Sequence, residues 1–187
     1  MFRSLSTAFA GLRSFAAYLA ISLYVVATAP LGILIARFVG RSNGLYRLGR
    51  WGVQLGLATV GIRYRVVGEH YIRPGQPTVY CVNHSSNLEP PVLFMVLAAV
   101  HPRLRVLYKA EIHRIPLLST VFDIAGFVPI QRRSREQSRY AIETAAKALR
   151  DGNSFLIFPE GTRSRTGDLL AFKKGGFVMA IKGGAMI

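Results

Sequence analysis

The chain has 187 residues, enough for one domain with an appendage but too few for two full domains. Its formal net charge is +15, because 24 lysines and arginines face only 9 aspartates and glutamates. This balance favours an anionic partner, such as nucleic acid, an anionic membrane surface or a phosphorylated small molecule. The single cysteine, Cys81, excludes an intrachain disulfide framework and a zinc site built from cysteines, and we interpret it as a small core residue.

The amino-terminal segment favours a membrane among these partners. Residues 15–36 carry no charged side chain and provide the roughly 20 residues that cross a bilayer core. Arg3 and Arg13 precede the segment, and a denser group follows it: Arg37, Arg41, Arg47 and Arg50. By the positive-inside tendency, this asymmetry predicts that the following domain lies on the cytoplasmic face, at the inner membrane in a bacterium. A signal peptide fits less well, because the apolar stretch is long and no clean small-residue cleavage site is present.

The sequence leaves the topology of this segment open. Pro30 and Gly32 interrupt it, so a spanning helix, a re-entrant hairpin and a tilted interfacial helix all fit. A second apolar stretch, 51–62, is too short to span a bilayer, and we expect it in the interface with Trp51 at headgroup level. We therefore predict a membrane-associated helical region over 1–62 and an α/β domain over 63–187.

Beyond residue 63, short β-rich runs alternate with helical patterns, after a turn at 73–77. Strands are predicted at 78–82, 105–109, 127–131 and 154–158. Helices are predicted at 90–100, 117–125 and 136–150, and from Lys174 onward. This alternation predicts an α/β fold with a largely parallel sheet and flanking helices.

The helix at 136–150 has the clearest pattern. Its apolar face consists of Ala141, Ala145, Ala148 and Leu149, and charged side chains occupy the other face. Asp151-Gly152 ends it. Residues 183–187 resemble the start of another buried strand, so we expect the chain to be a fragment that lacks a C-terminal part.

A histidine and a carboxylate, His84 and Glu89, follow the first predicted strand. A histidine can take a proton near neutral pH, and a nearby carboxylate can hold its ring in one tautomer. Open α/β sheets place their chemistry at strand ends. Most pairs at this spacing are ordinary loop contacts, so the hypothesis needs support from the other strand ends.

Basic and hydroxyl side chains follow the other predicted strands. The third strand runs into Arg132 and Arg133, and guanidinium groups bind phosphate in a two-pronged fashion. The fourth runs into FPEGTRS at 158–164, where amides, hydroxyls and guanidinium groups can cradle a phosphate. The remaining candidates are lysines at a strand end or a helix start: Lys109, Lys173 and Lys174. Read singly, each cluster is also explained by a solvated loop.

In chain order, these motifs resemble those of the glycerolipid (lysophospholipid) acyltransferase family, whose best-known members are the 1-acylglycerol-3-phosphate acyltransferases. The resemblance covers the chain from about Tyr64 to its last residue. The matching segments are 83–90, 126–132, 158–164 and 172–175. The first has a histidine and an acid separated by four residues, the second ends in an arginine, the third is FPEGTRS, and the fourth is basic. The next family block, an apolar strand with a proline, is expected just beyond Ile187.

The resemblance implies acyl transfer from a thioester to a hydroxyl. His84 would act as general base, with Glu89 holding the imidazole, and the acceptor hydroxyl would attack directly without an acyl-enzyme. The acceptor phosphate is expected to bind residues that follow the strands: Arg132, Glu160, Gly161, Thr162 and Arg163, with Lys109 and Lys173 as lesser candidates. The resemblance implies no cofactor and no metal. The acyl donor is a co-substrate, either acyl-CoA or acyl carrier protein.

One residue departs from the family's pattern. The first block normally carries aspartate, whereas Glu89 is one methylene longer. We expect it to reach the imidazole through a backbone shift or a folded-back rotamer, so that activity survives. The EGTRS form resembles the lysophosphatidate enzymes more than those that acylate glycerol 3-phosphate. Glycerol 3-phosphate, ornithine lipids and other lysolipids remain alternative acceptors.

Two other classes of function explain parts of the sequence. A nucleic-acid-binding protein would use the positive charge, but no nucleic-acid module is recognisable. A non-catalytic basic membrane-surface protein would use the amino-terminal segment, but it leaves His84 and FPEGTRS without a role. The partners we expect are membrane phospholipids, a lysophospholipid acceptor and an acyl thioester, with no nucleic acid.

Overall fold

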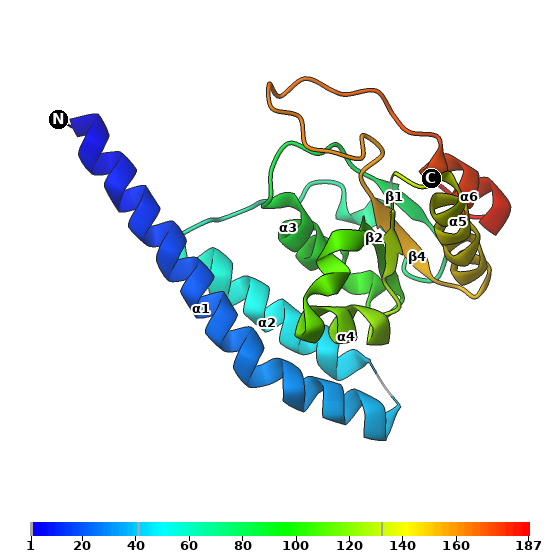
Figure 1. Cartoon of the computed structure of the whole chain (residues 1–187), viewed down its shortest axis with the longest axis horizontal. Helices are drawn as coiled ribbons and strands as arrows, with labels where there is room; N and C mark the ends of the chain where they lie inside the picture. The colour runs from blue at the N-terminus through cyan, green and yellow to red at the C-terminus, as the bar shows by residue number, and fades with distance from the viewer. Residues whose placement is uncertain (1, 41, 132) are drawn as a thin grey trace. The chain divides into compact units, whose positions relative to one another are not determined.

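The computed structural model describes residues 2–40, 42–131 and 133–187 of the chain (Figure 1). It divides into two compact units, Met1–Val67 and Gly68–Ile187. The division that we drew from the sequence, between a membrane-associated region over 1–62 and an α/β domain over 63–187, stays a prediction.

The first unit contains two helices, α1 (Phe2–Val39) and α2 (Asn43–Thr59). α1 continues through Pro30 and Gly32, so the apolar segment contains no hairpin turn of its own. α2 packs along α1 instead, and the Tyr24 hydroxyl donates to the Leu48 carbonyl at 2.8 Å.

Glycines allow the two helices to approach closely. A Cβ on Gly52 would lie 2.8 Å from Tyr24 Cε1, and one on Gly56 would lie 2.6 Å from Ile21 Cδ1. Small residues have this use where helices pack in membranes. The segment Phe9–Val39 is long and apolar enough to cross a membrane, and large apolar side chains such as Phe15 are exposed along it. This apolar helix indicates membrane association.

The second unit is built on a four-stranded parallel sheet with the order β1-β4-β2-β3. The strands are β1 (Val79–Cys81), β2 (Leu104–Lys109), β3 (Val128–Ile130) and β4 (Ser154–Ile157). Leu156 of β4 is paired with Tyr80 on one side and Val106 on the other. All four β4 residues are buried, as expected for a central strand covered on both faces.

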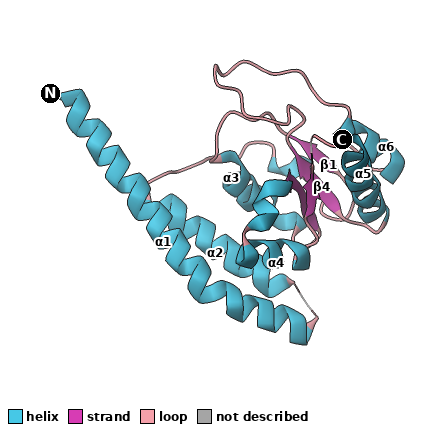
Figure 2. Ribbon diagram, viewed as in Figure 1, coloured by secondary structure: helices cyan, strands magenta, loops and turns pink. Residues whose placement is uncertain are grey.

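Helices flank both faces of this sheet (Figure 2). They are α3 (Glu89–Val96), α4 (Pro116–Ile124), α5 (Arg135–Arg150) and α6 (Gly175–Gly183), with the 3-10 helices η1 (Glu69–Tyr71), η2 (Leu97–Val100) and η3 (Ala110–Arg114). Successive strand residues face opposite sides. Tyr108 meets Phe122 of α4 edge to face, with ring centroids 4.8 Å apart, whereas Leu107 packs into the core beside α5 and α6. The predicted α/β class with a parallel sheet is confirmed.

α5 follows the predicted pattern with one difference in its buried face. Ala141, Ala145 and Leu149 are buried as predicted, but Ala146 is fully buried and Ala148 only partly. The reason is α6, which covers this side: a Cβ on Gly183 would lie 2.7 Å from Leu149 Cβ and 3.3 Å from the Ala146 carbonyl. Tertiary packing thus widens the apolar stripe that the helical period suggests.

The last residues begin to extend the sheet beyond β1. Met186 forms a parallel bridge with Thr78, and the Val79 amide donates to the Met186 carbonyl at 2.8 Å. The strand expected at 183–187 is represented by this single bridge in the part of the chain that the structure describes.

Candidate active site

The parallel sheet brings two of the predicted segments together at the carboxyl ends of its strands. The carboxyl ends of parallel strands all lie on the same side, and β1 and β4 are neighbours. His84 follows β1 and the segment 158–164 follows β4. These two segments therefore meet, although His84 and Glu160 are 76 positions apart in the chain.

His84 and Glu89 lie in direct contact, with Nδ1 of the imidazole 2.7 Å from Oε2 of the carboxylate. Glu89 is the first residue of α3, and its carboxylate folds back over the preceding loop. The amides of Ser85 and Ser86 donate to Oε1 at 2.9 and 3.0 Å, and the Ser85 hydroxyl donates to it at 2.7 Å. The longer glutamate thus reaches the imidazole from the start of a helix.

The hydrogen bonds at Glu89 determine its charge. Partial burial raises the pKa of Glu89, but the hydrogen bonds from His84, Ser85 and Ser86 outweigh burial and leave this pKa below its ordinary value. The carboxylate is therefore ionised at neutral pH, and as an acceptor it favours the imidazole tautomer that carries its proton on Nδ1. This tautomer leaves a lone pair on His84 Nε2, the nitrogen that can take a proton from a substrate.

The imidazole is also held from its face. The rings of His84 and Phe158 stack with centroids 4.1 Å apart and an interplanar angle of 26°. The His84 side chain is 18% exposed, and no described residue hydrogen-bonds its Nε2. The ring is therefore oriented on two sides while its base nitrogen stays available.

The FPEGTRS segment wraps around the backbone of His84. Glu160 is buried, and its carboxylate accepts the His84 amide at 2.6 Å and the Leu170 amide at 3.0 Å. The Ser164 amide donates to the His84 carbonyl at 2.7 Å. Gly161 has a φ of 69°, a left-handed conformation that favours glycine in this turn.

Cationic and hydroxyl groups surround the same turn. The Lys173 side chain lies over Gly161, where an added Cβ would be 2.9 Å from Lys173 Nζ. Thr162 and Arg163 are exposed, and Arg163 forms no ion pair with any described carboxylate. A phosphate placed at this turn would therefore meet at least two cations.

The two remaining basic candidates follow other strands. Lys109 ends β2 and forms an exposed ion pair with Glu111, with Nζ and Oε1 3.6 Å apart. Arg132, expected at the end of the third strand, lies outside the described residues.

Several contacts of His84, Glu89 and Glu160 were missed by the sequence analysis. They are Ser85, Ser86, Phe158, Ser164 and Leu170. One signal was available: Ser86 and Glu89 have the Ser-x-x-Glu spacing of a capping box, in which the glutamate reaches back to the serine amide. The contacts of Phe158, Ser164 and Leu170 have no comparable local signal, because they depend on strand order.

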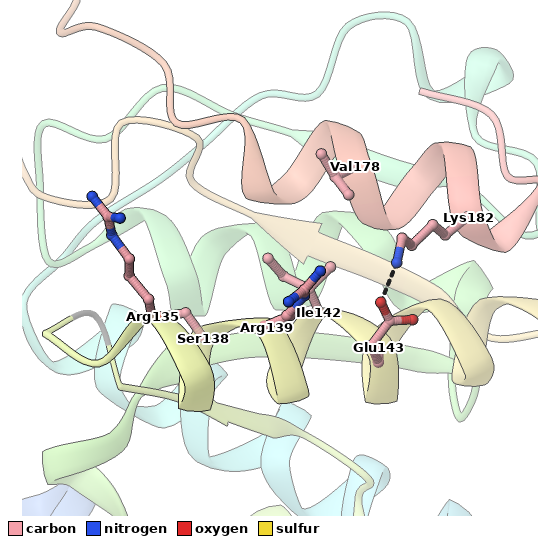
Figure 3. Close-up of a pocket in the computed structure, with 7 residues that line it drawn as sticks. All are labelled: Arg135, Ser138, Arg139, Ile142, Glu143, Val178 and Lys182. Carbon is pink, nitrogen blue, oxygen red and sulfur yellow. Dashed lines mark hydrogen bonds and ion pairs between the residues drawn. The ribbon is translucent and has the colours of Figure 1, made fainter.

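A separate groove of about 380 Å³ lies between α5 and α6 (Figure 3). Its lining residues are Arg135, Ser138, Arg139, Ile142, Glu143, Val178 and Lys182. The Lys182 ammonium pairs with the Glu143 carboxylate across it. The predicted site residues that the structure describes are not among those that line this groove.

Known proteins share this sequence and fold. A 1-acyl-sn-glycerol-3-phosphate acyltransferase of Borreliella burgdorferi is 33% identical over 135 residues, which are 72% of this chain and 53% of that protein. The human 1-acyl-sn-glycerol-3-phosphate acyltransferase beta is 30% identical over 168 residues, 89% of this chain and 59% of that protein. The chain thus spans little more than half the length of these relatives.

A solved structure shows the same fold. The crystal structure of the 1-acyl-sn-glycerophosphate (LPA) acyltransferase PlsC from Thermotoga maritima superposes with a TM-score of 0.76 at 20% identity, covering 94% of this chain and 71% of that one. Residues 63–187, two thirds of the chain, match the family described as Acyltransferase. With its histidine and acid in contact beside the FPEGTRS turn, the chain belongs to the acyltransferase family.

Proposed function

We propose that the protein moves a fatty acyl group from an acyl thioester to the free hydroxyl of a lysophospholipid. The acceptor is 1-acylglycerol-3-phosphate and the product is phosphatidic acid. The 2.7 Å contact between His84 Nδ1 and Glu89 carries this proposal, because it orients a base beside a turn that presents cations. The names of the relatives and the EGTRS form of the turn support the same acceptor.

In the proposed reaction, His84 moves one proton and forms no bond to the acyl group. The acceptor oxygen attacks the thioester carbonyl carbon while its proton passes to Nε2 of His84. Glu89 stabilises the imidazolium that forms. When the tetrahedral intermediate collapses, the C–S bond breaks and the leaving thiolate takes the proton from Nε2. The imidazole is neutral again after each turnover.

The acceptor phosphate would bind at the turn after β4. Arg163 and Lys173 supply charge, Thr162 supplies a hydroxyl, and Gly161 allows close approach of the backbone. Lys109 and Arg132 follow the neighbouring strands β2 and β3 and are proposed as further contacts. Such a site favours a phosphomonoester, which carries more charge than a phosphodiester headgroup.

The amino-terminal helix would bring this chemistry to its lipid substrates. Segment Phe9–Val39 would anchor the protein, and the chain's net charge of +15 would attract it to anionic lipid on the cytoplasmic face. The acyl donor is a thioester of coenzyme A or of acyl carrier protein.

A thiol-release assay on the full-length protein tests the proposal. Oleoyl-CoA is supplied with lysophosphatidate, glycerol 3-phosphate or a lysolipid that lacks a phosphomonoester. We expect the highest kcat/KM with lysophosphatidate, and loss of the rate in His84→Ala. Preference for another acceptor would replace the substrate assignment. Absence of thiol release with every acceptor would refute the enzymatic proposal and favour a non-catalytic membrane-surface protein.

A further inference from the structure

Glu160 is a carboxylate within the turn that is proposed to bind a phosphate. It sits between the dyad and the cationic turn, where a carboxylate would repel a bound phosphate. Yet the residue is only 2% exposed, and each of its two oxygens accepts a backbone amide. Its lone pairs are therefore directed toward the protein backbone.

The first of these bonds holds the catalytic candidate itself. The Glu160 carboxylate accepts the His84 amide at 2.6 Å, and the Ser164 amide of the same loop donates to the His84 carbonyl at 2.7 Å. The peptide groups on both sides of the His84 Cα are thus fixed by one loop. A backbone held in this way restricts the direction in which the imidazole leaves the chain.

The second bond ties this loop to itself. The other Glu160 oxygen accepts the Leu170 amide at 3.0 Å, ten positions further along the chain. The segment 161–174 has no helix or strand, so hydrogen bonds such as this one hold its shape. A buried charge needs such hydrogen bonds to offset its loss of hydration, and charge-assisted bonds are stronger than neutral ones.

We propose that Glu160 is a positioning residue, which fixes the His84 backbone and the loop 161–170 instead of contacting the acceptor. The inference rests on the proposed function, because it assigns His84 as the base. It separates the turn into two roles: Glu160 faces inward and orients the base, whereas Arg163 and Lys173 face the acceptor phosphate.

Selective ¹⁵N-histidine labelling tests the contact without any assay of activity. The chain has four histidines, so the His84 amide is one of four signals, assigned by its absence in His84→Ala. In the native protein we expect slow hydrogen exchange at this amide and a downfield proton shift from the short bond to a carboxylate. Exchange as fast as in an exposed loop would overturn the proposal, whatever the variants do.

Glu160→Gln is the matched variant, because one carboxamide oxygen can accept only one of the two amides and the NH₂ group opposes the other. Asp168→Asn is the control: it removes one carboxylate from the same loop, where Asp168 is exposed and accepts only from within that loop. We expect Glu160→Gln to increase exchange at the His84 amide and Asp168→Asn to leave it unchanged.

Kinetics on the same proteins separate positioning from acceptor binding. Moving a catalytic base by about 1 Å can lower the rate by about 100-fold. We therefore expect kcat to fall by up to that factor in Glu160→Gln, while KM for lysophosphatidate stays within about threefold. A raised KM with native kcat and a native His84 amide would overturn the proposal and make Glu160 an acceptor contact. If the native protein transfers no acyl group, the proposed function fails, and the amide exchange still decides whether Glu160 holds His84.

Discussion

Replacing Glu89 by glutamine changes the charge of the dyad with little change in shape. Glu89 accepts hydrogen bonds from the His84 ring and from two backbone amides, and a carboxamide cannot accept them all. It also carries no charge to stabilise the imidazolium. A comparable Asp-to-Asn change in a hydrolase triad lowers kcat by about 10⁴-fold, so we expect a fall of about 10³–10⁴-fold in Glu89→Gln.

Glu89→Asp gives the intermediate case. The side chain is shorter by one C–C bond of about 1.5 Å, so with an unmoved backbone the 2.7 Å contact to His84 would lengthen to about 4.2 Å, beyond hydrogen-bond range. The charge remains, and a shift of the loop at 85–88 by about 1 Å would restore the bond. Because a misplacement of that size costs up to about 100-fold, we expect kcat no more than about 100-fold below native.

Single-turnover thiol release with oleoyl-CoA and lysophosphatidate measures these rates for the native protein, both Glu89 variants and His84→Ala. The expected order is native, Glu89→Asp, Glu89→Gln, His84→Ala, and circular dichroism verifies that each variant is folded. A native rate in Glu89→Gln, or a lower rate in Glu89→Asp than in Glu89→Gln, would refute the argument that charge and orientation at Nδ1 matter.

Three further predictions follow from charge and packing. The pKa of Glu89 is lowered in the folded chain, so the ionised side chain stabilises the fold at pH values above its unfolded pKa of about 4.3. This stabilisation is lost as the pH falls through the folded pKa. Between about pH 6 and 3 the urea midpoint should therefore fall more in the native protein than in Glu89→Gln. Arg163→Ala should raise KM for lysophosphatidate by about tenfold or more. The control is Arg103→Ala, which lies at the amino-terminal end of β2 and should leave this KM unchanged. Equal KM values in the two variants would contradict phosphate binding at the turn. Gly183→Ala should destabilise the fold by about 1–3 kcal/mol in urea unfolding because its Cβ would press on α5, while Gly75→Ala, in open space, should be nearly neutral; an unchanged midpoint in Gly183→Ala would contradict the packing.

Local patterns in the sequence predicted most elements to within a residue or two. The strand predicted at 105–109 appears as Leu104–Lys109, and the helix predicted at 136–150 appears as Arg135–Arg150. Alternation of apolar runs and a helical period are local properties, and they also indicated that the strands would be parallel. The continuity of α1 through Pro30 was not predictable in this way, because a proline can either bend a helix or end it.

The residue types of the site were likewise available from the sequence. His84, Glu89 and the FPEGTRS run were identified as candidates from their positions after apolar strands. The contacts between the FPEGTRS run and His84 could not be predicted from the sequence, and Glu160 is the clearest example. Its side chain was expected to bind the acceptor, and its observed partners are the amides of His84 and Leu170.

The sequence by itself determined the fold class, the apolar amino-terminal helix and a set of chemically competent residues, because these follow from composition and short-range periodicity. Only the tertiary structure decided which of those residues touch. β4 lies beside β1 although two strands separate them in the chain, and this order brings Glu160 and Phe158 against His84. Strand order is set by the packing of all the helices and strands together, so no local pattern encodes it.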